Sequence, residues 1–265
     1  MTVAQGKLPD GVTVSPVRAF SDNYIWCLHN NTHVVVVDPG EAQPVLTFCR
    51  ENSLTLSAIL ITHHHHDHTG GIEKLISTRP DIPVIGPRGG HIRGVTQSVV
   101  QGDTVSLADL KCEFSVIEVP GHTLDHLAFA GQGLVFCGDT LFAAGCGRLF
   151  EGSAAQMLHS LNKLQRLPDD TLVYCAHEYT QSNIRFAKSV EPENQELQDY
   201  ALGVENLRKD DKPTIPSDIK TQKAVNPFLR VNEPNVVAAA NSFSNQALND
   251  EVSIFASLRK WKDEF

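Results

Sequence analysis

Short apolar runs alternate with polar segments rich in Gly, Pro, Asn and Asp through the first two thirds of the chain. Apolar positions three or four residues apart predict helices at 43–52, 71–78 and 154–167. Runs rich in β-branched and aromatic residues predict strands at 12–17, 24–28, 33–37, 58–62, 84–85, 112–118, 126–130, 134–137 and 172–175. Strands with interspersed helices indicate sheets covered by helices, an α/β or α+β architecture.

The pattern changes after about residue 178, where helical spacing continues but strand-like runs stop. Helices are predicted at 180–190, 194–208, 234–240 and 248–262. The segment 209–226, with its lysines and two prolines, is predicted to be an exposed connection. We therefore predict two domains, a β-rich catalytic domain at 1–177 and a smaller helical domain at 178–265.

Composition narrows the class of protein. The 265 residues are 41% hydrophobic and 20% charged, as in ordinary globular proteins, and no apolar run is long enough to span a membrane. The net charge of −9 argues against nucleic acid as a partner, because phosphate binding requires a basic surface. Six cysteines without a CxxC pair predict free thiols, and the N-terminus lacks a secretory or transit pattern. We expect a cytoplasmic monomer.

The candidate chemistry is concentrated in Leu60-Ile-Thr-His-His-His-His-Asp-His-Thr-Gly-Gly71. This segment follows a predicted strand and precedes a helical pattern, so it is a ligand-bearing loop rather than a terminal tag. Alternation along an extended chain places His63 and His65 on one side, where they can share a metal ion. The turn into the helix redirects Asp67 and His68 together, toward a second ion. Neither ion needs the two remaining histidines, His64 and His66.

Two metal sites need further ligands, and three later motifs supply them just beyond predicted strands. These motifs are Pro120-Gly-His122-Thr, Phe136-Cys-Gly-Asp139-Thr and Tyr174-Cys-Ala-His177-Glu. Taken singly, each polar residue fits a turn equally well. Together with the histidine run they complete two sites of imidazole and carboxylate ligands, an arrangement that activates water between two metals.

The order THxHxDH, PGHT, CGDT and a later histidine resembles the metallo-β-lactamase superfamily. The resemblance implies an α+β fold, an αββα sandwich with its metal site at one edge. Asp38, in Val37-Asp-Pro-Gly40, matches a further motif, either as a turn residue or as support for the metal loop. The implied ligands are His63, His65 and His122 for the first metal, Asp67, His68 and His177 for the second, and Asp139 as the bridge.

The flanking segments resemble the glyoxalase II family, the hydroxyacylglutathione hydrolases, over nearly the whole chain. This family converts S-D-lactoylglutathione and water to D-lactate and glutathione, the second step of methylglyoxal degradation. The resemblance rests on Gly145-Cys-Gly-Arg-Leu-Phe-Glu-Gly152, Cys175-Ala-His-Glu-Tyr179, Val190-Glu-Pro-Glu-Asn194, Asn226-Pro-Phe-Leu-Arg230 and Arg259-Lys-Trp-Lys262.

The resemblance also implies which residues bind the glutathione thioester. Arg259 and Lys262 share one helix face and would hold the glycine end of glutathione, although a solvated helix terminus explains the same pair. Phe150 stands where some family members have tyrosine, so it offers packing or backbone contact only. The implied substrate-binding residues are Arg148, Phe150, His177, Tyr179, Arg259 and Lys262.

The implied reaction is thioester hydrolysis assisted by two divalent metal ions per chain. Imidazole and carboxylate ligands suit zinc, iron or manganese, and zinc is the expected metal with the other two as alternatives. Asp139 and Asp67 are the catalytic residues: the first sets the separation of the ions, and the second could accept a proton. The alternatives are another hydrolase of the same fold, a general thioesterase or lactonase, or a metal-binding redox or interaction module that does not hydrolyse.

Overall fold

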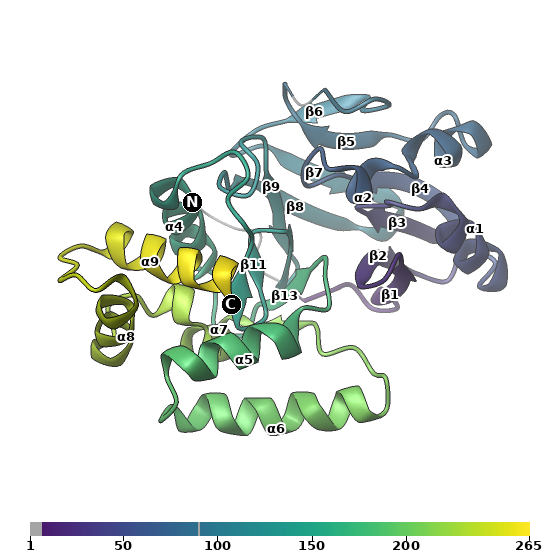
Figure 1. The fold of residues 1–265 in the computed structure, drawn as a ribbon. Helices are drawn as coiled ribbons and strands as arrows, with labels where there is room; N and C mark the ends of the chain where they lie inside the picture. Colours follow the sequence, from purple (N-terminus) through teal and green to yellow (C-terminus); the bar gives the residue numbers. More distant parts are fainter. Residues whose placement is uncertain (1–6, 90) are drawn as a thin grey trace. The chain divides into compact units, whose positions relative to one another are not determined.

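The computed structural model describes residues 7–89 and 91–265, and Figure 1 shows the course of the chain. Residues 1–6, the start of the N-terminal segment in which no secretory or transit pattern was expected, lie outside the described residues. Internal contacts divide the chain into two compact units. The first unit is Met1–Glu118 with Asp125–Gly138, and the second is Val119–Leu124 with Asp139–Phe265. The domain boundary between residues 177 and 178 remains a prediction.

The first unit contains two sets of strands and the helices that cover one of them. Its helical elements are α1 (Ala42–Glu51), α2 (His66–Thr69), α3 (Ile72–Thr78) and the 3-10 helix η1 (Ala108–Leu110). Its strands are β1 (Thr13–Ala19), β2 (Asn23–His29), β3 (His33–Val37), β4 (Thr55–Leu60), β5 (Val84–Pro87), β6 (Gln97–Val99), β7 (Thr104–Leu107), β8 (Cys112–Glu118), β9 (Leu127–Gly131) and β10 (Leu134–Gly138).

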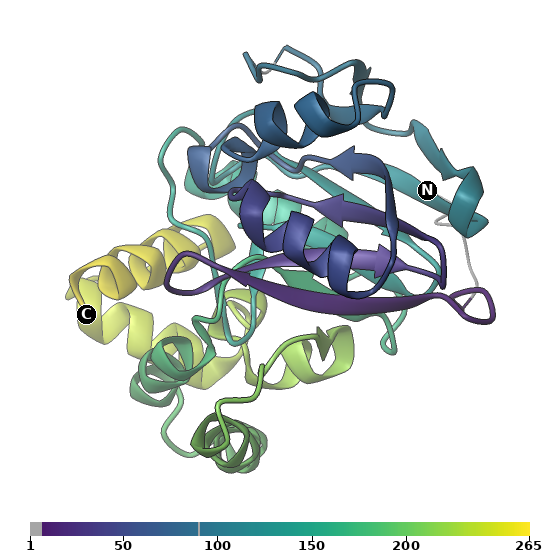
Figure 2. The same cartoon turned by 90° about the vertical axis from the view of Figure 1, so that its right-hand side faces the viewer.

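The strands β1 to β6 form a sheet in sequence order, antiparallel from β1 to β3 and parallel from β3 to β6. One face of this sheet packs against α1 and α3, and Figure 2 shows α1 lying across its strands. Strand β3 is apolar on both faces, and four of its five residues are buried. A continuous apolar run of this kind predicts a strand covered on both sides.

The strands β7 to β10 pair antiparallel in the order β10-β9-β8-β7. Phe114, Phe129 and Phe136 are fully buried in this layer. Each buried phenylalanine contributes about 1.5–3 kcal/mol relative to an exposed one. The apolar faces of the two strand sets thus account for the core of the first unit.

The second unit is mainly helical. Its strands are β11 (Leu141–Phe142), β12 (Gly145–Cys146), β13 (Leu172–Cys175) and β14 (Ser217–Asp218). Its helical elements are α4 (Ala154–Leu164), α5 (Thr180–Val190), α6 (Gln195–Lys209), α7 (Ile219–Val225), the 3-10 helix η2 (Pro227–Leu229), α8 (Pro234–Ser244) and α9 (Glu251–Glu264).

Local sequence signals explain where these helices begin. Ser153 and Gln156 form a capping box at the start of α4, and Asn194 caps α6 through its side chain. Helices α5 and α6 lie side by side (Figure 1) and bury an apolar cluster between them. Phe186 and Phe228 stack with ring centroids 5.9 Å apart and join α5 to η2.

The structure corrects three expectations about the chain. The segment 209–226 is not an exposed connection, because it contains β14 and α7, and Gln222 and Asn226 are fully buried. β14 also shows that strands do not stop after residue 178. The short strands β6 and β7 went unpredicted, because each has only three or four residues, too few for a strand pattern to be recognised. Among the described residues, no helix is both long and apolar enough to cross a bilayer.

Candidate metal centre

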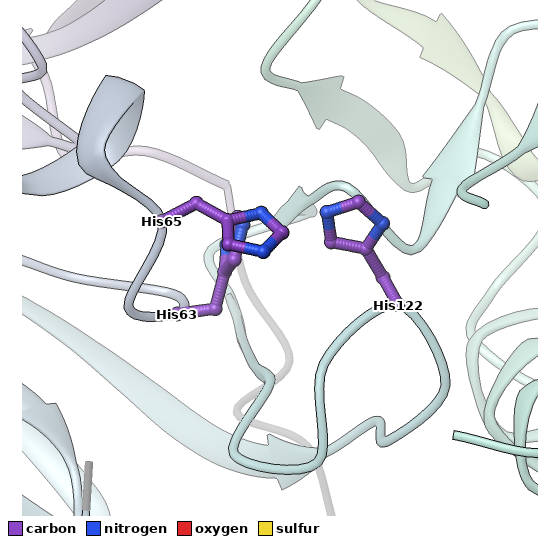
Figure 3. Close-up of side chains that lie close together, drawn as sticks. All are labelled: His63, His65 and His122. Atoms are coloured by element: carbon purple, nitrogen blue, oxygen red, sulfur yellow. The ribbon is translucent and has the colours of Figure 1, made fainter. Parts of the chain in front are cut away.

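The histidine run lies between β4 and α3 and forms the first ligand cluster, defined as His63, His65, Asp67 and His68. The rings of His63 and His65 are 4.7 Å apart, and those of His63 and His68 are 4.1 Å apart. Figure 3 shows the His63 and His65 imidazoles leaving this loop next to each other. The first turn of α2 begins at His66, so Asp67 and His68 leave the chain in new directions.

A chain of hydrogen bonds fixes the orientation of the His63 ring. The hydroxyl of Thr62 donates to Asp38 Oδ2 at 2.7 Å, and its backbone N–H donates to Asp38 Oδ1 at 2.8 Å. Because the hydroxyl proton is used, Thr62 Oγ1 accepts from His63 Nδ1 at 3.1 Å. His63 then carries its lone pair on Nε2, which is the tautomer that a metal ligand needs.

Asp38 serves both as a turn residue and as support for the metal loop. Its φ of 54° is left-handed, which is tolerated by aspartate in tight turns. Its Oδ2 also lies 3.1 Å from His68 Nδ1. The Nε2 of His68 lies 3.3 Å from Asp67 Oδ2, and Asn23 Nδ2 donates to that same oxygen at 3.0 Å.

The second ligand cluster lies in the second unit and is defined as His122, Asp139 and His177. All three residues are buried. Asp139 Oδ2 lies 3.5 Å from His122 Nε2 and 3.3 Å from His177 Nε2. Figure 3 shows the His122 ring leaving the loop between β8 and β9.

The tautomer of His122 shows what this cluster can hold. His122 Nδ1 bonds to the backbone carbonyl of Arg148 at 2.9 Å, and a carbonyl can only accept, so Nδ1 donates. Nε2 of the neutral ring therefore presents a lone pair to the Asp139 carboxylate. Two acceptors facing each other in a buried place repel unless a proton or a metal cation lies between them. Imidazole nitrogen and carboxylate oxygen are a donor set for zinc, iron or manganese, so the residues fit a divalent metal.

The two histidines expected to be dispensable differ in their surroundings, and the His64 ring centroid lies 5.1 Å from that of His65. His64 Nδ1 lies 3.0 Å from Asp125 Oδ1, and His66 is exposed. Sequence reasoning missed His126, whose fully buried ring stacks on His63 at 4.5 Å with an interplanar angle of 16°. The second histidine of Pro120-Gly-His122-Thr-Leu-Asp-His126 was the available signal. Its place at the start of a buried strand favoured a core role.

Two aromatic rings pack on the second ligand cluster. Phe150 is 63% exposed and meets the His122 ring edge-on at 5.2 Å. Tyr179 stacks on the His177 ring at 4.7 Å with an interplanar angle of 6°. Both rings leave apolar surface open to solvent beside proposed metal ligands. Arg148, whose carbonyl orients His122, has an exposed side chain that lies 3.5 Å from Asp263.

Arg259 and Lys262 differ in accessibility. Arg259 is 5% exposed, and its Nη1 donates to the backbone carbonyl of Cys146 at 2.9 Å, while Nη2 donates to Asp263 at 3.0 Å. Lys262 is half-buried and lies 3.4 Å from the Ser182 carbonyl. Burial, together with the charges of neighbouring arginines, lowers the pKa of Lys262 to about 8. Lys262 is thus the more available cation for an anionic ligand.

The comparisons with known proteins agree with this geometry. Residues 20–177 match the family model of the metallo-beta-lactamase superfamily. A metallo-beta-lactamase from Staphylococcus aureus has the same fold, with a TM-score of 0.62 and 17% identity over 95% of this chain and 71% of that chain. ETHE1 from Myxococcus xanthus matches with a TM-score of 0.55 and 27% identity over 81% of this chain and 96% of that chain. The fold and the donor set therefore define a metallo-β-lactamase-superfamily protein.

The helical part and the full-length relatives narrow the family. Residues 178–265 match the model of the hydroxyacylglutathione hydrolase C-terminus. Hydroxyacylglutathione hydrolase from Nitrosomonas europaea is 52% identical over 254 residues, 96% of this chain and 97% of the relative. That from Aliivibrio salmonicida is 54% identical over 254 residues, 95% of this chain and 99% of the relative. The chain belongs to the hydroxyacylglutathione hydrolase family, and the predicted fold class and enzyme class are confirmed.

Proposed function

We propose that the protein hydrolyses S-D-lactoylglutathione and related S-2-hydroxyacylglutathiones to the hydroxy acid and glutathione, with two divalent metal ions bound. The family supports this substrate class, because relatives named hydroxyacylglutathione hydrolase align over nearly the full length. The observation that carries the metal requirement is the pair of imidazole nitrogens, on His122 and His177, that face one Asp139 oxygen. This reaction would be the second step of methylglyoxal degradation.

The proposed ligand sets combine the two clusters. His63, His65 and His122 would hold one ion, and Asp67, His68 and His177 would hold the other. Asp139 is proposed as a ligand of both. Support comes from the tautomers of His63 and His122, each of which leaves Nε2 available for a metal. A similar solved structure, that of TTHA1623 in a di-iron-bound form, is 27% identical over 62% of this chain. Zinc is the proposed metal, and iron and manganese are the alternatives that metal analysis would detect.

Bound divalent ions would supply Lewis acidity toward water and the thioester carbonyl. The chain's own residues do the rest. Asp139 holds the ligand set together between His122 and His177. Asn23 Nδ2 donates to Asp67 Oδ2 at 3.0 Å and so fixes the orientation of this carboxylate, which would be placed to accept a proton from water. The thiolate of glutathione is a good leaving group, so the reaction does not require a dedicated general acid.

Substrate binding is assigned to the second unit. Lys262 and Arg148 supply positive charge for the glutathione carboxylates, and Arg259 anchors the helix that carries Lys262 by donating to the Cys146 carbonyl. Tyr179 offers a hydroxyl donor, while Phe150 offers only apolar contact. We propose that residues 178–265 are the substrate-binding domain. All six cysteines are free thiols, which supports a reducing compartment such as the cytoplasm.

The substrate class is tested by comparing kcat/KM of metal-replete protein for S-D-lactoylglutathione, a simple lactone and a coenzyme A thioester. We expect the glutathione thioester to be preferred by at least about a hundredfold, because binding energy from the glutathione moiety contributes to transition-state stabilisation. Equal turnover of the coenzyme A thioester would indicate a general thioesterase. Preferential lactone turnover would indicate a lactonase.

A further inference from the structure

A short hairpin follows the proposed bridging ligand directly. Strands β11 and β12 are joined by Ala143 and Ala144, only a few residues after Asp139. Ala144 is fully buried and has a φ of 55°, in the left-handed region that a non-glycine residue seldom adopts. A buried turn with an unusual backbone conformation requires partners for its peptide groups, because they are cut off from water.

Three side-chain amides from the helical part supply those partners. Asn183, on α5, donates to the Ala143 carbonyl at 3.1 Å. Gln222, on α7, accepts from the Ala144 N–H at 2.7 Å. Asn226, just after α7, donates to the carbonyls of Phe142 at 3.2 Å and Gly145 at 2.9 Å. We call Asn183, Gln222 and Asn226 the amide clamp.

The amide clamp is itself buried and organised. Asn183 is 5% exposed, and Gln222 and Asn226 are fully buried. Gln222 Nε2 donates to Ser217 Oγ at 3.0 Å, and Asn226 Oδ1 accepts from the Phe228 N–H at 3.1 Å. Buried amides with partners on both the oxygen and the nitrogen have fixed orientations, so they define one position for the hairpin rather than a range.

Apolar packing holds the tip of the hairpin in the same place. Ala144 belongs to the apolar cluster that includes Ile184 and Ala187 of α5 and Leu197 and Val204 of α6. A Cβ on Gly145 would lie 2.5 Å from the Asn183 amide nitrogen, so only glycine fits against the clamp. The hairpin tip is therefore part of the helical core.

The far side of the hairpin leads to the second ligand cluster. The Gly147 N–H donates to the Thr140 carbonyl at 3.2 Å, and a Cβ on Gly147 would lie 2.0 Å from the Asp139 carbonyl oxygen. The next residue is Arg148, whose carbonyl fixes the His122 tautomer. A shift of the hairpin would therefore move the backbone at Asp139 and the hydrogen-bond acceptor of His122 together.

We propose that Asn183, Gln222 and Asn226 are positioning residues for the metal centre, acting through the β11–β12 hairpin on Asp139 and His122. This inference rests on the proposed function only in naming Asp139 and His122 as metal ligands. It gives the helical segment 178–265 a second role beside substrate binding, since two clamp residues lie in the segment 209–226. Mutation of a group that orients a metal ligand typically lowers metal affinity about ten- to a hundredfold.

The test is Asn226→Asp, which keeps the acceptor for Phe228 but removes the amide donor to the hairpin. Asn194→Asp is the matched control, because Asn194 also caps a helix through Oδ1 and donates through Nδ2, but to Ala224 rather than to the hairpin. Three quantities are measured for each protein. They are the metal affinity, by competition with a chelator; kcat and KM, with S-D-lactoylglutathione as substrate; and the rate of hydrogen exchange at the Ala144 amide.

We expect Asn226→Asp to weaken binding of at least one metal by at least about tenfold, with faster Ala144 exchange and a lower kcat at nearly unchanged KM. The control should keep wild-type metal affinity and kcat. Wild-type metal affinity and kcat in Asn226→Asp, or unchanged exchange at Ala144, would overturn the inference. If Asn226→Asp does not fold, Asn183→Ala removes one clamp bond and is judged by the same criteria. Failure of the wild-type protein to bind metal would refute the proposed function, whereas the exchange rates would still report on the clamp.

Discussion

His122 donates from Nδ1 to the backbone carbonyl of Arg148 at 2.9 Å, and its other nitrogen faces Asp139. This single hydrogen bond decides which nitrogen carries the lone pair. It also shows how an exposed arginine contributes to a buried site, since the backbone carbonyl of Arg148 orients His122 while its exposed side chain lies 3.5 Å from Asp263.

Replacing Asp139 by alanine should release at least one metal ion. The carboxylate lies within 3.5 Å of His122 Nε2 and within 3.3 Å of His177 Nε2, so its loss leaves two imidazoles without the shared anionic ligand. We expect kcat to fall by at least about a hundredfold, as for loss of a group that organises metal catalysis. Asp170→Ala, at an exposed position, is the control. Full metal content in Asp139→Ala would contradict the bridge.

His63→Ala and His64→Ala should differ in metal content, because His63 is a proposed metal ligand and His64 is not. His63 is buried and oriented by Thr62, so its loss should remove one metal ion per chain. The His64 side chain is 37% exposed and pairs with Asp125, and its loss should cost about 0–1 kcal/mol of stability with both ions retained. Metal analysis of both variants decides the matter. Loss of a metal from His64→Ala would mean that His64, not its neighbour, is the ligand.

Arg259→Ala should raise KM more than it lowers kcat. The guanidinium anchors α9 to the Cys146 carbonyl and, through α9, positions Lys262. Neither side chain is proposed to contact the bond that breaks, so substrate binding should be affected more than the chemical step. Lys260→Ala is the matched control on the same helix, because the Lys260 side chain is 72% exposed and pairs with Glu264 at 3.9 Å. Steady-state kinetics with the glutathione thioester measure the effect. An unchanged KM in Arg259→Ala would leave it a purely structural residue.

Substrate affinity should depend on pH through Lys262. Burial, followed by the charges of Arg259, Arg185 and Arg148 and opposed by Asp263, lowers its pKa to about 8. As pH rises through 8 the side chain loses its charge, so KM for the thioester, which carries two carboxylates, should rise. Lys262→Gln should show a raised KM that lacks this pH dependence. Measuring KM of both proteins between pH 7 and about 9.5 covers the titration of the Lys262 side chain.

The same shift has a consequence for stability with a defined sign. The folded-state pKa of Lys262 lies below the ordinary lysine value, so between these values the unfolded chain binds more protons. Lys262 therefore makes the free energy of unfolding increase with pH above 8. Its charge weakens the fold below that pH. A pH-independent difference in stability between wild type and Lys262→Gln would contradict the shift.

The Glu191–Arg230 pair should be important for folding but not for chemistry. Glu191 is 3% exposed and accepts from Arg230 Nε at 2.7 Å and Nη2 at 3.0 Å. Removing one partner of a buried pair costs about 3–5 kcal/mol, because the other charge is left buried. Urea denaturation of Arg230→Met should show a loss of this order, with kcat of the folded fraction unchanged. A loss below about 1 kcal/mol would place the pair among weak surface pairs.

Sequence alone predicted the positions of most strands along the chain and the residue types of the candidate metal centre. The run at 63–68 could be divided because alternation along a strand is a local property of the backbone. Helix α5 was predicted to the residue, since its apolar spacing and flanking residues are unambiguous. The family resemblance then implied roles for His122, Asp139 and His177. These residues lie in three motifs far apart in the sequence, so no local pattern assigns them to particular metal ions.

Contacts between distant residues were beyond the reach of sequence patterns. Gln222 and Asn226 stand in a segment rich in lysine and proline, so a polar loop was the reasonable expectation, yet both are buried partners of the β11–β12 hairpin. Arg259 looks like a solvated helix terminus in sequence but is buried by Cys146 and Phe228. In each case packing between residues that lie far apart in the sequence decides the burial of a polar side chain, and local polarity does not predict it.

The most direct test of the account is a metal titration of chelator-treated protein, with S-D-lactoylglutathione hydrolysis and bound metal measured on the same samples. The account predicts no turnover without metal, and full turnover when two divalent ions are bound per chain. Full thioester turnover by metal-free protein, or no thioester turnover with two ions bound, would contradict it.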